Sequence, residues 1–223
     1  MKTLRNHSLS LFFFAIFIAA LIGQAIAGNA EFNNEAIAHG SETMSFGSYV
    51  VSADFGQAVM ENWQSEYLQF TLFIFATVWF VQKGSPESKK LDEVGTDSDK
   101  DQKVGQYAQQ NSPKWARARG FKLWLYSNSL LLVMLTIWLG SWLAHSLTGW
   151  RVFNEEALDH DESTLSWVQY LGSSDFWNRT VQNWQSEFLA VGSMAILAVY
   201  LRQRGSPESK PVGATHDATG QTG

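Results

Sequence analysis

The chain has 223 residues and a formal net charge of -5, so it lacks the basic balance that nucleic-acid binding needs. It contains no cysteine, which excludes disulfides, thiolate metal ligands and cysteine nucleophiles. Its mean hydropathy of -0.13 is typical of a soluble protein, but the apolar residues are gathered into four blocks separated by charged stretches. These blocks predict an all-α membrane protein.

The four apolar blocks predict four transmembrane helices. The first block, Leu9 to Ala27, would reach about 28 Å as a helix, which is enough for the hydrocarbon core of a bilayer. The second is strictly apolar only from Tyr67 to Val81, so it must begin near Asn62 to span. The predicted spans are 9–27, 62–82, 123–143 and 183–201.

A cleaved signal peptide is the alternative for the first block. Lys2 and Arg5 precede it, and it ends in Ala25-Ile26-Ala27, which has the pattern of a cleavage site. The corresponding block in the second half of the chain is internal and cannot be a signal. We therefore expect the first block to be retained and the protein to keep its amino end.

The second half of the chain repeats the first at an offset of 121 residues. The match runs without a gap from Gly28/Gly149 to Lys89/Lys210. It includes Asn-Trp-Gln-Ser-Glu at 62–66 and 183–187, and Gly-Ser-Pro-Glu-Ser-Lys at 84–89 and 205–210. A period this long indicates a duplicated two-helix unit rather than a solenoid.

The basic residues predict the orientation. Fourteen of the sixteen Lys and Arg lie in residues 1–8, 82–122 and 202–223, whereas the two intervening loops carry only Arg151 and Arg179. By the positive-inside rule, both termini and the central segment are cytoplasmic. Each copy then begins and ends inside, so the two repeats are parallel, with short interfacial helices expected in the outer loops.

We expect four parts along the chain: repeat 1 (1–90), a flexible cytoplasmic linker (91–120), repeat 2 (121–211) and a disordered tail (212–223). The linker is polar and has too few large apolar residues to fold alone. Its basic end, Trp115 to Arg119, fits either a segment lying on anionic headgroups or a simple excess of cytoplasmic charge.

Two local motifs have structural explanations. The Gly-Ser-Pro-Glu-Ser-Lys runs follow the second and fourth spans, where glycine suits a left-handed residue past a helix end and proline prevents continuation; a partner-binding motif is the alternative. Asp54 and Asp175 precede the same spans and are expected to cap them. The segments 45–52 and 166–173 suggest short helical turns or interfacial re-entries.

Two sets of polar residues are candidate sites. Glu35 and His39, with Glu156 and His160, stand four apart and would share helix faces, which makes them a weak metal candidate beside the reading as solvated helix pairs. A polar intramembrane cluster is the second hypothesis, in competition with each Glu simply capping its helix or reaching interfacial water. Its members are Asn62, Gln64, Glu66, Asn183, Gln185 and Glu187.

The repeated Asn-Trp-Gln-Ser-Glu and Phe-Asn-(Asn/Glu)-Glu-Ala elements and the run Arg-Gln-Arg-Gly-Ser-Pro-Glu-Ser-Lys resemble a family of uncharacterised bacterial integral membrane proteins, a domain of unknown function. The first copy has Val81-Gln82-Lys83 in place of Arg-Gln-Arg. The resemblance spans nearly the whole chain and implies residence in the bacterial cytoplasmic (inner) membrane, but no activity.

The sequence shows no catalytic signature and implies no cofactor, so we expect no enzyme. The main hypothesis is a structural or regulatory protein of the bacterial envelope whose partners are the lipid bilayer and another protein or a second copy of itself. The alternative is a small ion or solute conduit that uses the paired intramembrane Glu66 and Glu187.

Overall fold

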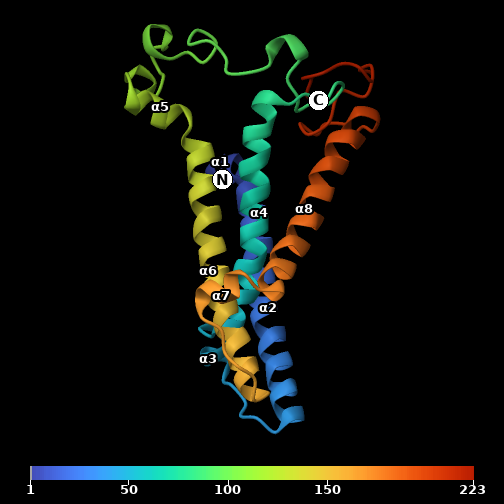
Figure 1. Cartoon of the computed structure of the whole chain (residues 1–223). Coiled ribbons are helices and arrows are strands. Elements are labelled where there is room, and N and C mark those ends of the chain that lie inside the picture. The colour runs from blue at the N-terminus through green and yellow to red at the C-terminus, as the bar shows by residue number, and fades with distance from the viewer. Residues whose placement is uncertain (1) are drawn as a thin grey trace. The chain divides into compact units, whose positions relative to one another are not determined.

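A computed structural model describes residues 2–223, and all of the secondary structure in that range is helical (Figure 1). Helices account for 67% of the chain, which confirms the all-α prediction. The elements in chain order are α1 (Lys2–Asn6), α2 (Ser8–His39), α3 (Phe46–Val50), α4 (Ala53–Trp79), η1 (Leu91–Glu93), η2 (Gly105–Tyr107), η3 (Lys114–Arg117), α5 (Phe121–Ser127), α6 (Ser129–Asp159), α7 (Trp167–Leu171) and α8 (Ser174–Tyr200).

Two helices, α2 and α6, are long and apolar enough to cross a membrane, with 32 and 31 residues. Helices α4 and α8 have 27 residues each, which is long enough, but they are not apolar enough by the same measure. Two of the four predicted spans thus meet the requirement for a membrane helix. For α4 and α8 the span remains a prediction.

Helix α2 continues well past the predicted end of the first span at residue 27. Residues 28–39 contain several alanines and glutamates and no proline, so nothing in them interrupts the helix. Gly40 ends it in the left-handed conformation (φ 72°), where its N–H donates to the carbonyl of Ile37. At 32 residues the helix is about 48 Å long, more than a bilayer core requires.

Apolar side chains face outward on the long helices, and several polar side chains face inward. Phe12, Phe13 and Phe14 on α2 are 60–66% exposed, whereas Gln64 on α4 and His145 on α6 are fully buried. A soluble protein would expose such an apolar surface to water at a large cost. This distribution is typical of helices whose outer surface meets lipid.

The residue contacts divide the chain into two units. The first comprises Met1–Met60 and Ala144–Leu171, and the second comprises Glu61–Leu143 and Gly172–Gly223. Helices α4 and α6 contribute to both units, and α8 belongs wholly to the second. This division differs from the boundaries predicted along the sequence at 90 and 121, which stay a prediction.

In the first unit, an asparagine fixes the loop after each long helix. The backbone N–H of Met44 donates to Asn33 Oδ1 (2.6 Å), and Asn33 Nδ2 donates back to the Met44 carbonyl (2.9 Å). Asn154 makes the same two bonds with Leu165, at 2.8 and 2.9 Å. A side-chain amide thus replaces a backbone partner in each loop and positions the short helices α3 and α7.

Each of these short helices places a tyrosine against a glycine. Tyr49 on α3 lies over Gly28, and Tyr170 on α7 lies over Gly149. Both tyrosines are buried, Tyr170 completely. The two segments are therefore helical turns that pack on the long helices, and the repeated Gly/Tyr positions of the sequence are contacts in the fold.

The predicted N-caps are wrong by two residues. Ser52 Oγ accepts the N–H of Phe55 (3.3 Å), and Ser173 Oγ accepts that of Phe176 (3.2 Å). The serines cap these helix starts because a short hydroxyl side chain reaches the N–H three residues on. Asp175 instead sits in the first turn, where its charge suits the helix dipole.

Candidate functional site

The two Gly-Ser-Pro-Glu-Ser-Lys runs form turns in the second unit. In the first turn (residues 84–89), Gly84 has a φ of 87°, and Ser88 Oγ accepts the N–H of Gln82 at 2.9 Å. Lys89 Nζ donates to the carbonyl of Gly95 at 2.8 Å. The lysine therefore folds back onto the segment that follows it and closes a compact structure.

The second turn (residues 205–210) repeats this geometry. Gly205 has a φ of 81°, and Ser209 Oγ accepts the N–H of Gln203 at 2.9 Å. Lys210 is buried, and its Nζ donates to the carbonyl of His216 at 2.9 Å. Equal local sequence thus gives equal hydrogen bonding at both turns.

The closing segments also satisfy a carbonyl in the last turn of each helix. The N–H of Gly95 donates to the carbonyl of Val78 in α4 (2.9 Å), and His216 Nδ1 lies 3.2 Å from the carbonyl of Val199 in α8. Because a carbonyl only accepts, that ring nitrogen carries the proton. These contacts cover helix ends that would otherwise leave carbonyls unpaired.

The prediction that the motif stops the helix is only partly right. Gly84 and Gly205 do adopt the left-handed conformation that was expected. However, α4 ends at Trp79 and α8 at Tyr200, so four residues separate each helix from its glycine. The motif therefore covers the helix end by folding back over it, and does not itself terminate the helix.

The turns bring one carboxyl group from each copy together. The side chains of Glu87 and Glu208 are close enough to interact, and a hydrogen bond between two carboxyl groups requires a proton on one of them. The hydrogen bond, burial and the charge of Glu208 raise the pKa of Glu87 from 4.5 to about 7. Both residues are exposed, so water can deliver and remove this proton.

Two mainly apolar cavities adjoin Glu87. Their volumes are about 250 and 290 Å³, and residues of α4 and α8 line both of them. Phe73, Glu87 and Ala195 line both cavities. Glu87 is therefore a carboxyl group at the edge of an apolar space between two helices, and its ionisation changes the polarity there.

The predicted intramembrane cluster is assembled differently from the expectation. Gln64 is buried, and its Oε1 accepts the indole N–H of Trp184 (2.8 Å). Asn183 Nδ2 donates to Glu61 Oε1 (2.9 Å). Glu61 also lies 3.9 Å from Arg179, which binds Asp175 one turn earlier in α8.

The other predicted cluster residues are less buried than Gln64. Asn62, Glu66 and Gln185 are exposed, and Glu187 is half-buried. Glu66 and Glu187 are close enough for their charges to repel each other. The structure thus joins Gln64 to Trp184 and Asn183 to Glu61, and a cluster of all six residues stays a prediction.

Sequence reasoning missed Glu61 and Arg179. Glu61 has Gln182 as its equivalent in the second copy, so the repeat gave no reason to select it. Arg179 was visible as one of only two basic residues in the two loops, 28–62 and 146–186, that the sequence predicts to lie outside. An isolated cation beside several predicted polar residues is the signal that could have found the ion pair.

The metal candidates bind their own helices. His39 Nδ1 lies 2.9 Å from the carbonyl of Glu35, and His160 Nδ1 lies 2.8 Å from that of Glu156. Across residues 2–223, no group of three or more His, Asp or Glu side chains is placed to hold a metal ion. The metal hypothesis therefore gains no support.

The fold defines a class: an all-helical protein with two helices long and apolar enough to cross a membrane. The comparisons then give the family. The chain belongs to the family described as a domain of unknown function (DUF6766), whose model matches residues 1–221. No curated protein and no solved structure matches the chain.

Proposed function

We propose that this chain is a four-span protein of the bacterial cytoplasmic membrane with a structural or regulatory role, its copies parallel and both termini cytoplasmic. The outward-facing apolar side chains of α2 and the asymmetry of Lys and Arg support this arrangement. Helices α4 and α8, at 27 residues or about 40 Å, have the length to span a core of roughly 30 Å.

We further propose that Glu87 and Glu208 form a proton-dependent clasp between the cytoplasmic ends of α4 and α8. The observation that carries this proposal is the proximity of the two carboxyl groups, one from each turn, beside the apolar cavity that Glu87 lines. With the proton present the carboxyls bind each other, and without it two negative charges repel. The clasp then couples cytoplasmic pH to the separation of the two helices.

Spin labels on the two turns test the clasp directly. The chain has no cysteine, so Gln82→Cys and Gln203→Cys give two exposed, equivalent and initially uncharged labelling positions. Pulsed electron paramagnetic resonance then measures the distance between the labels. We expect a short, narrow distribution at pH 5.5 and a longer, broader one at pH 8.5.

Two variants in the labelled background separate the clasp from general effects of pH. Glu87→Gln keeps a donor for the Glu208 carboxylate at every pH, so the distribution should stay narrow at pH 8.5. Glu93→Gln is the matched control, because Glu93 is an exposed carboxylate of the same segment that pairs with Lys90. The proposal is rejected if the parent distances ignore pH, or if Glu87→Gln still responds.

Reporter tags test the membrane arrangement independently. Tags at residue 1, within 95–105 and after 215 should report the cytoplasm, and tags near 40 and 161 should report the outside. A tag in 95–105 that reports the outside would overturn the orientation, which rests on the positive-inside rule. It would leave the carboxyl pair itself untouched.

An ion conduit is the second candidate function, favoured by the proximity of Glu66 and Glu187. Neighbouring carboxylates in a membrane protein are a place where a cation or proton can bind. Purified protein in proteoliposomes should then pass protons or a monovalent cation, and Glu187→Gln should reduce the flux. Flux equal to that of empty vesicles would exclude this role.

A further inference from the structure

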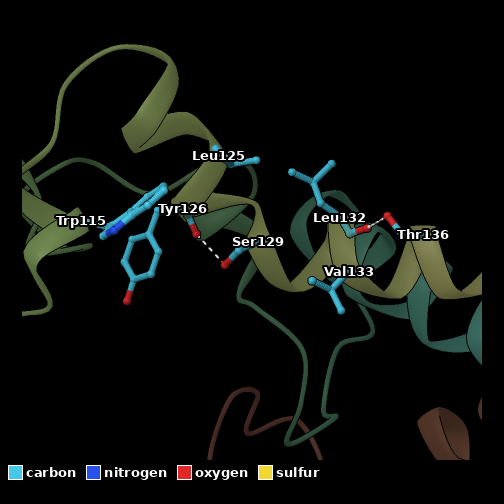
Figure 2. A pocket seen from close by; sticks show the side chains of 7 residues that line it. All are labelled: Trp115, Leu125, Tyr126, Ser129, Leu132, Val133 and Thr136. Carbon is cyan, nitrogen blue, oxygen red and sulfur yellow. Dashed lines mark hydrogen bonds between the residues drawn. The ribbon is translucent and has the colours of Figure 1, made fainter.

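An apolar groove lies in the second unit where α5 meets α6. Its volume is about 410 Å³, within the roughly 300–1,000 Å³ typical of ligand pockets. Figure 2 shows Trp115 and Tyr126 at one end and aliphatic side chains of α6 along the other. The principal lining residues are Trp115, Leu125, Tyr126, Leu132, Val133 and Thr136.

A helix break creates this groove. α5 ends at Ser127 and α6 begins at Ser129, while Asn128 Nδ2 donates back to the carbonyl of Trp124 (2.8 Å). The serine and threonine hydroxyls in the lining donate to their own backbone, Ser129 Oγ to the Tyr126 carbonyl (2.8 Å) and Thr136 Oγ1 to the Leu132 carbonyl (2.7 Å; Figure 2). The space that remains offers contacts to an apolar chain and few hydrogen bonds.

Basic residues lie close along the chain to the residues that line the groove, and no carboxylate pairs with them in the described part of the chain. The segment 114–122 contains four exposed basic residues, and residues 102–154 contain no Asp or Glu. Within the described chain none of the four forms an ion pair. Arg117 donates to the carbonyls of Gln109 and Gln110, so its guanidinium holds the loop. The other three are Lys114, Arg119 and Lys122.

We propose that this groove binds an anionic phospholipid of the cytoplasmic leaflet, with one acyl chain in the groove and the phosphate held by Lys114, Arg119 and Lys122. An apolar groove beside uncompensated cations complements an amphiphile with a negative head. Beside the Trp115 indole and the Tyr126 hydroxyl the lining is mostly aliphatic, so it gives the backbone of a peptide few hydrogen-bonding partners. The proposal rests on the cytoplasmic placement of residues 82–122 proposed above.

The test is a lipid titration of the full chain in detergent, read by native mass spectrometry. Phosphatidylglycerol and phosphatidylcholine with identical acyl chains are compared for binding of the first lipid. Phosphatidylcholine has the same phosphate, but its choline cancels the charge. Each cation near a headgroup of net negative charge contributes a factor of about five in affinity, so three predict a preference of roughly 100-fold for phosphatidylglycerol. The double variant Arg119→Gln/Lys122→Gln should reduce it to roughly fivefold.

A second pair of variants tests the groove apart from the charge. Val133→Trp fills the groove, and because each buried methylene contributes a factor of about four, binding of both lipids should fall by about tenfold or more. Leu130→Trp is the matched control, since Leu130 is equally exposed on α6 but does not line the groove. Lys100→Gln/Lys103→Gln removes two charges outside the segment 114–122, in the predicted linker 91–120, and should leave the preference unchanged.

Three results would overturn the proposal. Equal affinity for the two lipids would exclude a headgroup site. Unaltered lipid binding by Val133→Trp would show that surface charge alone attracts the lipid. If Lys100→Gln/Lys103→Gln lost as much of the preference for phosphatidylglycerol as Arg119→Gln/Lys122→Gln, any cation of the linker would serve. Because the titration is done in detergent, failure of the topology test with the preference intact would reject the orientation and keep the lipid site.

Discussion

Replacing Gly149 by alanine should destabilise the protein, although alanine is the better helix former. A Cβ atom at this position would lie 2.5 Å from the hydroxyl of Tyr170 and 3.3 Å from its Cζ atom. Tyr170 is completely buried, so its ring cannot swing into solvent to relieve the overlap. The matched control is Gly23→Ala in α2, where a Cβ would meet nothing within 4 Å.

The expected magnitude follows from two opposing terms. Exchanging glycine for alanine within a helix gains about 1 kcal/mol, and overpacking a buried contact costs about 1–3 kcal/mol. Gly23→Ala receives only the gain, whereas Gly149→Ala receives both terms. The two variants should differ by about 1–3 kcal/mol, or roughly 2–12 °C in melting temperature for a chain of this size.

The assay is thermal unfolding in detergent, followed by circular dichroism at the helical band. Tyr170→Phe removes the atom that the new Cβ would strike, so Gly149→Ala/Tyr170→Phe should be more stable than the sum of the single changes predicts. The reasoning fails if Gly149→Ala melts as high as Gly23→Ala. It also fails if the two changes are additive, since the hydroxyl would then not be the obstacle.

Three further predictions concern polar pairs. The raised pKa of Glu87 means that the folded state binds its proton more tightly, so stability should fall as pH rises from about 4.5 to about 7; melting curves of Glu87→Gln should show a flatter dependence. Asn154→Ala should cost about 2 kcal/mol, because two hydrogen bonds to Leu165 are lost, and should speed amide exchange at Leu165. The effects of Glu66→Gln and Glu187→Gln on the free energy of unfolding should be non-additive by about 0.5 kcal/mol or more, and additivity would exclude a shared site.

Much of the fold could be predicted because it is local. The apolar blocks indicated four long helices, and the structure has four, although α2 runs on to His39 because no residue before Gly40 stops it. Local hydrogen bonds could be predicted for the same reason, because residues at equivalent positions of the two similar stretches make the same bonds. Asn33 and Asn154 make the same bonds to their loops, and these bonds need only residues within one stretch of chain.

The sequence by itself therefore determined the four long helices and the left-handed glycine of each turn, since each depends on neighbours along the chain. The tertiary structure alone decided which side chains from the two halves of the chain contact each other. Gln64 is buried against Trp184 whereas its equivalent, Gln185, is exposed, and Glu87 meets Glu208. Spacing along one helix fixes the face on which a side chain lies, but the partner on that face comes from another helix. Two copies with the same local sequence thus place equivalent side chains in different surroundings.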